Sequence, residues 1–425
     1  MLIWLLALAL TAVLVDVARR LAPTLGLVDS PDDRKSHDGD IPLVGGIAIF
    51  SCLLVAMGVF GVLNEHWPFF VAASVIVSVG VWDDVHGISP AVRLGFQAGA
   101  VLLIALFGNA YLASLGQLLP FIPTFELGFM AIPFTVFAGV GLINAFNMSD
   151  GVDGVCGTLT LVALTGLGIV ASMAGRQSDL ALILVMGGGL VGFLLFNMRL
   201  PGRKQAKVFL GDAGSYLLGL SVLYLTIRLT QGEQPAMAPV TALWFCMVPL
   251  FDTVGMILRR LKRGRSPFSP DREHIHHVFL LAKFSVTETW VGLTVVAVLG
   301  MVLGLAATIA GVADYLVLGL FVGAAFLYHS MMSRSWKVLT FLSRSINRRV
   351  TASEDRRSGV DRRQRNEICY IDGIAVERRS GLERRKQSDD RRNGDDGDEA
   401  DADNVTVLAQ KPARERPGSR AARVS

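Results

Sequence analysis

Residues 179–197 read DLALILVMGGGLVGFLLFN, a stretch with no charge after its first residue. A bilayer core needs about 20 apolar residues per helix, so this stretch predicts a membrane-spanning helix. Its consecutive glycines at 187–189 predict close packing against a neighbouring helix, because small residues let two backbones approach. The stretch therefore indicates a helical membrane protein.

Similar apolar runs recur on both sides of this stretch as far as residue 333. They predict an all-α, polytopic integral membrane protein with about eleven transmembrane helices. The first run lacks a basic start and a small-residue cleavage site, so we expect a retained helix and not a signal peptide. The predicted spans are residues 1–19, 43–63, 68–82, 93–108, 128–146, 157–174, 179–197, 214–231, 238–258, 289–309 and 314–333.

The composition of the 425-residue chain agrees, with 52% apolar and 18% charged residues. Its net charge of +4 is divided unevenly along the chain. Residues 1–333 carry 18 Lys and Arg against 20 Asp and Glu, whereas residues 334–425 carry 22 against 16. We therefore expect a transmembrane domain over 1–333 and a cytoplasmic charged tail over 334–425, mostly disordered because its apolar content is low.

The basic residues beside the predicted helices fall in alternate loops, with Arg176 the main exception. Cytoplasmic loops carry an excess of Lys and Arg, so the N-terminus is expected outside the cytoplasm and the C-terminus inside. The basic residues that decide this are Arg19, Arg20, Arg34, Lys35, Arg199, Arg203, Lys204, Lys207, Arg259, Arg260, Lys262, Arg263, Arg265, Arg272 and Lys283.

In this orientation, the notable acidic residues collect on the cytoplasmic face. Carboxylates at a membrane boundary are costly and indicate function. A transporter would more naturally place them near the midplane of broken helices, whereas an enzyme acting on cytosolic and lipid substrates would collect them at the inner surface. We therefore expect an active site on the cytoplasmic face. The acids are Asp29, Asp32, Asp33, Asp83, Asp84, Asp150, Asp153 and Asp212.

Two adjacent carboxylates, Asp83 and Asp84, follow an apolar run. Like charges this close raise one another's pKa unless a cation lies between them, so the pair suits metal binding or a general base. A helix cap ahead of the turn at 87–90 is the alternative, although one aspartate would suffice for it.

Residues 144–154 read NAFNMSDGVDG and place two amides and two carboxylates among glycines. Glycines allow a backbone to approach a ligand closely. In a helix, Asp150 and Asp153 would share a face. A polar turn between helices is the alternative, but so many ligand-type side chains favour a binding loop.

Residues 208–215 read VFLGDAGS and follow Arg203, Lys204 and Lys207. One carboxylate beside glycines and cations suits a magnesium-bound diphosphate, because Mg²⁺ usually takes one or two carboxylates and completes its shell with water and phosphate. No Gly-Lys-Ser/Thr follows at P-loop spacing.

The predicted inner loop at 259–277 ends SPFSPDREHIHH and contains three histidines. No cysteine or well-spaced carboxylate completes a zinc site. Histidine and arginine donors for an anionic sugar nucleotide fit better, since arginine matches phosphate oxygens. A basic loop held by anionic lipid is the alternative, which would explain the arginines but not the histidines.

Together these motifs resemble the polyprenyl-phosphate N-acetylhexosamine-1-phosphate transferases, over about residues 26–285. The likeness includes DSP at 29–31, RKSH at 34–37 and IPLVGG at 41–46. The PDxxHIHH pattern at 270–277 resembles the bacterial branch that uses UDP-N-acetylglucosamine (UDP-GlcNAc) to start O-antigen and related surface polysaccharides.

This resemblance implies transfer of GlcNAc-1-phosphate from UDP-GlcNAc to undecaprenyl phosphate, giving undecaprenyl-diphospho-GlcNAc and UMP. It implies Mg²⁺, with Mn²⁺ as the alternative ion, and a multi-pass position in the inner membrane with a periplasmic N-terminus. Membrane lipid is an expected partner and nucleic acid is not, while a homodimer and a partner for the tail stay open.

The resemblance also implies roles for individual residues. Asp83 is the candidate base, and Asp153 and Phe209 would meet uracil. A third acid that often follows the aspartate pair is replaced by Gly87, so its role is dispensable or filled elsewhere. The implied catalytic residues are Asp83, Asp84, Asp150 and Asp153, and the implied metal ligand is Asp212. The implied substrate-binding residues are Lys35, Asn144, Asn147, Asp153, Asn197, Phe209, Arg265, His274, His276 and His277.

Two other functions remain as alternatives. The same reaction with another UDP-N-acetylhexosamine is the nearer one, and a membrane transporter is the more distant one. The tail carries a repeated arginine motif, RRSGVDRRQ at 356–364 and RRSGLERRK at 378–386. An arm that adheres to anionic lipid or a docking site for a partner would each account for the repeat.

Overall fold

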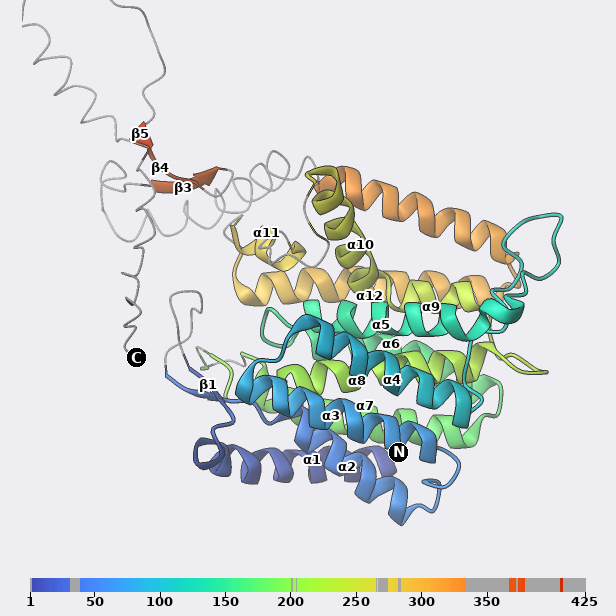
Figure 1. Ribbon diagram of the computed structural model, residues 1–425, viewed down its shortest axis with the longest axis horizontal. Coiled ribbons are helices and arrows are strands. Elements are labelled where there is room, and N and C mark those ends of the chain that lie inside the picture. The colour runs from blue at the N-terminus through green and yellow to red at the C-terminus, as the bar shows by residue number, and fades with distance from the viewer. Residues whose placement is uncertain are drawn as a thin grey trace, which may run out of the picture. The chain divides into compact units, whose positions relative to one another are not determined.

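The computed structural model describes residues 2–30, 39–199, 202–203, 205–264, 266, 274–281, 284–332, 367–371, 374–378 and 406–407. Two compact units divide the chain, Met1–Ser343 and Arg344–Ser425. The first unit is a bundle of helices that run side by side (Figure 1).

The first unit consists of α1 (Leu2–Leu21), α2 (Gly45–Val59), α3 (Trp67–His86), α4 (Pro90–Phe107), α5 (Ala131–Met148), α6 (Val155–Met173), α7 (Gln177–Asn197), α8 (Gly211–Thr230), α9 (Pro239–Phe245), α10 (Met247–Lys262), α11 (Ile275–Leu281), α12 (Val286–Ile309) and the helix Asp314–Met332. Short elements η1 (Ala22–Leu25), η2 (Gly128–Met130), β1 (Val28–Asp29) and β2 (Ile41–Pro42) connect them. Within the described residues, nine helical segments are long and apolar enough to cross a membrane, which confirms the all-α polytopic prediction.

In two of the predicted spans, the structure does not have one continuous helix of membrane-spanning length. The second, 43–63, contains α2, which has only 15 residues. The ninth, 238–258, contains α9 and α10, which meet at a bend of 85°. Pro249 lies in the first turn of α10. A continuous helix is disfavoured there, because proline lacks the N–H and its ring would clash with the carbonyl four residues earlier.

Helix α8 is the most buried span of the bundle, with 89% of its apolar window buried. Glycines on its neighbours allow them to approach it closely. A Cβ atom at Gly80 of α3 would lie 2.2 Å from the Ala213 Cα, and one at Gly46 of α2 would lie 2.3 Å from the Gly214 nitrogen. The N-terminal end of α8 is therefore tightly enclosed.

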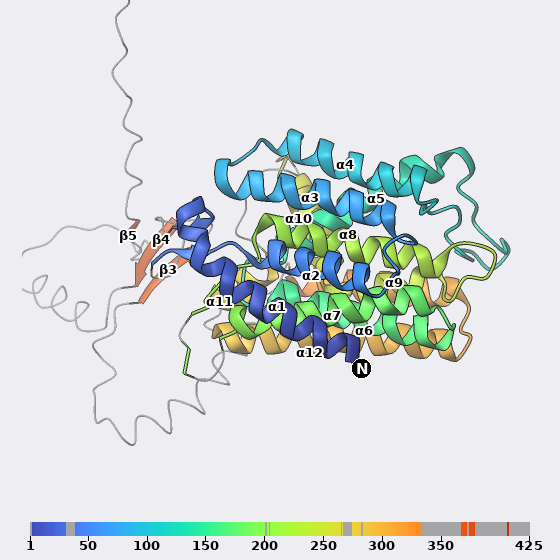
Figure 2. The same ribbon diagram turned by 90° about the horizontal axis from the view of Figure 1, so that it is seen from below.

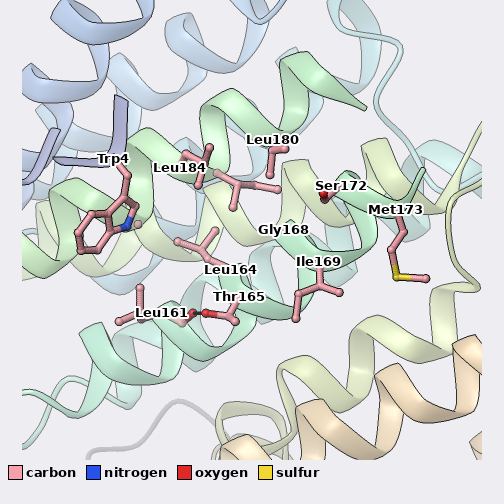
Figure 3. Close-up of a pocket in the computed structure, with 12 residues that line it drawn as sticks. Trp4, Leu161, Leu164, Thr165, Gly168, Ile169, Ser172, Met173, Leu180 and Leu184 are labelled. Atoms are coloured by element: carbon pink, nitrogen blue, oxygen red, sulfur yellow. Dashed lines mark hydrogen bonds between the residues drawn. The ribbon is translucent and has the colours of Figure 1, made fainter. Parts of the chain in front are cut away.

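The glycine stretch of α7 packs as its sequence predicts. A Cβ atom at Gly188 would lie 2.3 Å from the carbonyl oxygen of Trp4, and α1 lies across α7 (Figure 2). An apolar cavity of about 400 Å³ adjoins Trp4 and extends between α6 and α7 (Figure 3). No acidic or basic residue lines this cavity, so it is not the site at which the predicted acidic residues would gather.

The second unit contains β3 (Glu367–Ile371), β4 (Ile374–Arg378) and β5 (Thr406–Val407), which form an antiparallel sheet in the order β3-β4-β5. The prediction of a mostly disordered tail did not include these strands. Asp372-Gly373 separates β3 and β4 in the sequence, and Asp-Gly is a favoured pair in two-residue hairpin loops. The first arginine repeat, 356–364, lies outside the described residues, as does the second from 379 onward.

Candidate active site

The adjacent aspartates at the C-terminal end of α3 meet the N-terminal end of α8. Asp84 Oδ1 accepts a hydrogen bond from the Asp212 backbone N–H at 2.9 Å, and Oδ2 accepts one from the Ala213 N–H at 3.4 Å. Asp84 therefore caps α8 from another helix, satisfying donors that a helix start leaves unpaired. Gly211 is required here, because its φ is +73° and a Cβ would lie 2.6 Å from Asp84 Oδ2.

Asp83 is buried and both of its oxygens accept hydrogen bonds. Oδ2 accepts from Arg93 Nη1 at 3.0 Å and from the Tyr216 hydroxyl at 3.1 Å. Oδ1 accepts from the Ile88 N–H at 2.9 Å. Donors to both oxygens hold the carboxylate in one orientation.

The predicted metal ligand, Asp212, lies beside the end of α5. Its Oδ1 accepts a hydrogen bond from Asn147 Nδ2 at 2.7 Å, and Asn147 Nδ2 also donates to Ser215 Oγ at 2.9 Å. Arg93 Nη1 lies 4.0 Å from Asp212 Oδ2 as well as contacting Asp83, so one cation lies between two carboxylates.

The loop between α5 and α6 adds two more carboxylates. Burial raises the pKa of Asp150 well above its ordinary value, and the charges of Asp212, Asp84 and Asp153 raise it further. Asp153 Oδ2 accepts a hydrogen bond from Arg199 Nε at 2.6 Å. The predicted catalytic acids of α3 and the α5–α6 loop therefore converge with the predicted metal ligand of α8.

Other predicted substrate residues tie the loops around these acids together. Asn197 Oδ1 accepts from the Gly154 N–H at 2.8 Å, and its Nδ2 donates to the Val208 carbonyl at 3.0 Å. Phe209 pairs through its backbone with Pro42 of β2. Asn144 lies one turn before Asn147 and donates to Gln97 Oε1 at 2.6 Å. Their roles toward a substrate stay predictions.

The histidine motif lies at α11. His274 Nδ1 lies 2.9 Å from Asp252 Oδ2 on α10. His276 and His277 belong to α11, but their side chains lie outside the described part of the structure, as do Lys35 and Arg265.

Three site residues were not among the predicted ones. Arg93 and Asp252 are charged residues within apolar spans, which is a signal of function in membrane proteins. Tyr216 lies four positions after Asp212 and so shares its helix face. All three could have been found by examining the interior of the spans as closely as the loops between them.

This bundle defines the class of protein as a polytopic membrane protein whose acidic residues converge at one end of its helices. The chain matches the model of glycosyl transferase family 4 over residues 66–230, the segment from the start of α3 to the end of α8. That segment contains every predicted catalytic acid.

Curated relatives cover most of the chain. It is 38% identical to the undecaprenyl-phosphate alpha-N-acetylglucosaminyl 1-phosphate transferase of Escherichia coli strain K12, over 80% of this chain and 92% of the relative. Proteins of the same name from Salmonella typhimurium strain LT2 and Haemophilus influenzae are 37% and 35% identical, over 82% and 77% of this chain and 95% and 92% of the relatives. The chain belongs to glycosyl transferase family 4 and is a glycosyl-1-phosphate transferase.

Proposed function

We propose that the protein transfers GlcNAc-1-phosphate from UDP-GlcNAc to undecaprenyl phosphate. The observation that carries this proposal is the convergence of Asp83, Asp84, Asp150 and Asp212 at one end of the bundle, with Arg93 between two of them. The names of the relatives, which give undecaprenyl phosphate and N-acetylglucosaminyl 1-phosphate transfer, support the acceptor and the transferred group. UDP as the carrier of the sugar and the first membrane step of O-antigen or related polysaccharide synthesis as the cellular role are parts of the proposal.

In the proposed reaction, an oxygen of the lipid phosphate attacks the β-phosphorus of UDP-GlcNAc. The bond from that phosphorus to the bridging oxygen breaks, and UMP leaves with the bond's electron pair. Asp83 takes the proton of the lipid phosphate, and Arg93 and Tyr216 hold its carboxylate in place. Because anions are brought together, catalysis is mainly positioning and charge neutralisation.

The donor set fits a hard divalent cation such as Mg²⁺, with Mn²⁺ as the alternative. No group of three or more His, Cys, Asp or Glu in the described part of the chain forms a complete metal site. Mg²⁺ needs only one or two carboxylates when phosphates complete its shell, and Asp212 with Asp150 supplies them. The bound ion would neutralise charge on the diphosphate. Burial and, after it, repulsion from Asp212, Asp84 and Asp153 raise the pKa of Asp150, and a bound cation would relieve the repulsion.

The proposed orientation places the acids at the cytoplasmic face of the inner membrane and the N-terminus in the periplasm. The loop between α4 and α5, at the opposite ends of α3 and α8 from the acids, contains no Lys or Arg. This asymmetry supports a cytoplasmic acidic end. The prenyl chain can then remain in lipid while its phosphate meets the nucleotide.

Release of UMP tests the proposed function. We expect purified protein to release UMP from UDP-GlcNAc only when undecaprenyl phosphate is present, and to stop when EDTA removes divalent cations. A panel of UDP-N-acetylhexosamines identifies the donor. If the protein prefers another UDP-N-acetylhexosamine, that sugar nucleotide is the donor in place of UDP-GlcNAc. Movement of substrate into vesicles without release of UMP would indicate a transporter.

A further inference from the structure

Asp252 lies within the broken span and has no part in the reaction proposed above. Its side chain is buried, with 2% of the residue exposed. A buried carboxylate is costly unless it is paired, so its partners indicate why it is there. Those partners come from the histidine segment and from the helix Asp314–Met332.

Both oxygens of Asp252 are engaged. Oδ2 accepts a hydrogen bond from His274 Nδ1 at 2.9 Å, and Oδ1 accepts from the Ile275 N–H at 2.9 Å and from the Tyr328 hydroxyl at 3.1 Å. One carboxylate therefore holds the imidazole of His274 and the start of α11 together. An ionised carboxylate only accepts, so Nδ1 carries the hydrogen in this contact.

The neighbouring residue connects this contact to the acidic site. Thr253 Oγ1 lies 3.9 Å from the sulfur of Met148, at the end of α5 and two residues before Asp150. Ile275 packs against the main hydrophobic core. Asp252 thus lies where α10, the histidine segment and the end of α5 come together.

We propose that Asp252 is a positioning residue that orients the His274 imidazole toward the diphosphate of the sugar nucleotide. The inference rests on the proposed function and goes beyond it, because it assigns a role to a residue inside the membrane domain. Holding Nδ1 fixes both the tautomer and the rotation of the ring, as carboxylate partners of histidines do elsewhere. Nε2 is then the ring nitrogen directed at the diphosphate, and it donates a hydrogen bond to a phosphate oxygen when the imidazole is in its protonated form.

A double-mutant cycle tests this proposal. We expect Asp252→Asn to raise the KM for UDP-GlcNAc about tenfold, as loss of an orienting partner does in other sites, with little change in kcat or in the KM for undecaprenyl phosphate. The double variant with His274→Ala should be no worse than His274→Ala alone, because residues acting through one another are not additive. Asp314→Asn, an equivalent change at the start of another membrane helix, is the control and should keep wild-type kinetics.

Two results would overturn the proposal. Effects of Asp252→Asn and His274→Ala that multiply would show that they act independently. Equal losses for both substrates together with a lower melting temperature would show a purely structural role. Absence of UMP release by the wild-type protein would instead reject the proposed function, and the same cycle would then be measured as UDP-GlcNAc binding by calorimetry.

Discussion

Asp84 and Asp212 show how the role of an acidic residue depends on what its oxygens contact. Asp84 accepts hydrogen bonds from two backbone N–H groups of α8, whereas Asp212 accepts from the side chain of Asn147. Asp84 is therefore suited to positioning the start of α8. Asp212 projects from that start and is suited to cation binding, and the adjacent Asp83 is held by Arg93.

Asp212→Asn tests the metal assignment. We expect this variant to lose the divalent-cation-dependent release of UMP by about a thousandfold, because the charge that would hold the cation is removed while the side-chain shape is kept. Asp16→Asn is the matched control, since Asp16 pairs only with Arg19 and Arg20 on its own helix in the described contacts. Full activity of Asp212→Asn in a correctly inserted protein would reject the assignment.

The contact between α3 and α8 determines where the acids lie. Gly80 is one turn before Asp83 and Asp84, and its Cα faces the backbone of Ala213. Because glycine has no side chain, α3 can approach α8 closely enough for Asp84 to reach the start of α8. One extra methyl group would push the two helices apart, since a close-packed interior has no free volume to accept it.

Gly80→Ala should disturb both stability and catalysis. The new Cβ would lie 2.2 Å from a backbone atom that cannot move aside alone, so we expect a loss of about 1–3 kcal/mol in stability, as for other overpacked sites. Thermal denaturation in detergent and UMP release measure the two effects. Gly99→Ala in α4 is the control, because nothing lies within 4 Å of its Cβ and alanine favours a helix. Equal melting temperatures for the two variants would contradict the steric interpretation.

A second polar network joins α3, α7 and α8 at their other ends. Arg228 donates to Asp179 at 2.7 Å and to Glu65 at 2.8 Å. His66 Nδ1 lies 3.0 Å from the Tyr224 hydroxyl, and His66 Nε2 lies 2.8 Å from the Ser178 hydroxyl.

His66 should make stability depend on pH. Burial and the charge of Arg228 lower the pKa of His66, although Asp179 and Glu65 oppose this. The unfolded chain then binds the proton more tightly, with a pKa of about 6.5, so stability falls as pH decreases below that value. We expect the melting temperature to fall between about pH 7.5 and pH 5.5, and less steeply in His66→Gln. His86→Gln, which replaces an exposed histidine at the C-terminal end of α3, should keep the wild-type slope, and an unchanged slope in His66→Gln would refute the prediction.

At the scale of the whole molecule, the predicted catalytic acids and the tail belong to different compact units. Every described residue of the candidate site lies within Met1–Ser343. In the tail, β4 pairs with β3 along one edge and with β5 along the other.

Deletion of residues 345–425 should leave catalysis almost unchanged. We expect kcat/KM within about twofold of the full chain, because a compact unit with its own core generally folds without its neighbour. UMP release per inserted molecule, with insertion measured by quantitative membrane fractionation, checks this. A truncated protein that inserts normally but does not turn over would show that the tail contributes to the chemistry.

The sequence by itself determined the membrane class, the helical segments and the acids of the site. Apolar length and charge are local properties, so they are readable without a fold, and the glycines at 187–189 predicted the close contact that α7 makes with α1. The bend at Cys246 was missed because no charged residue lies between Pro239 and Phe251, and only Pro249 indicates the break.

Only the tertiary structure decided which of these residues act together. Asp84 and Asp212 are 128 positions apart, and Asp252 and His274 are 22 apart, yet each pair is joined by one hydrogen bond. Such pairings depend on how closely two helices pack. That distance is set jointly by the side-chain volumes on both helices. No local pattern contains that information, and for this reason the partners of Arg93, Tyr216 and Asp252 became apparent only when the helices were assembled.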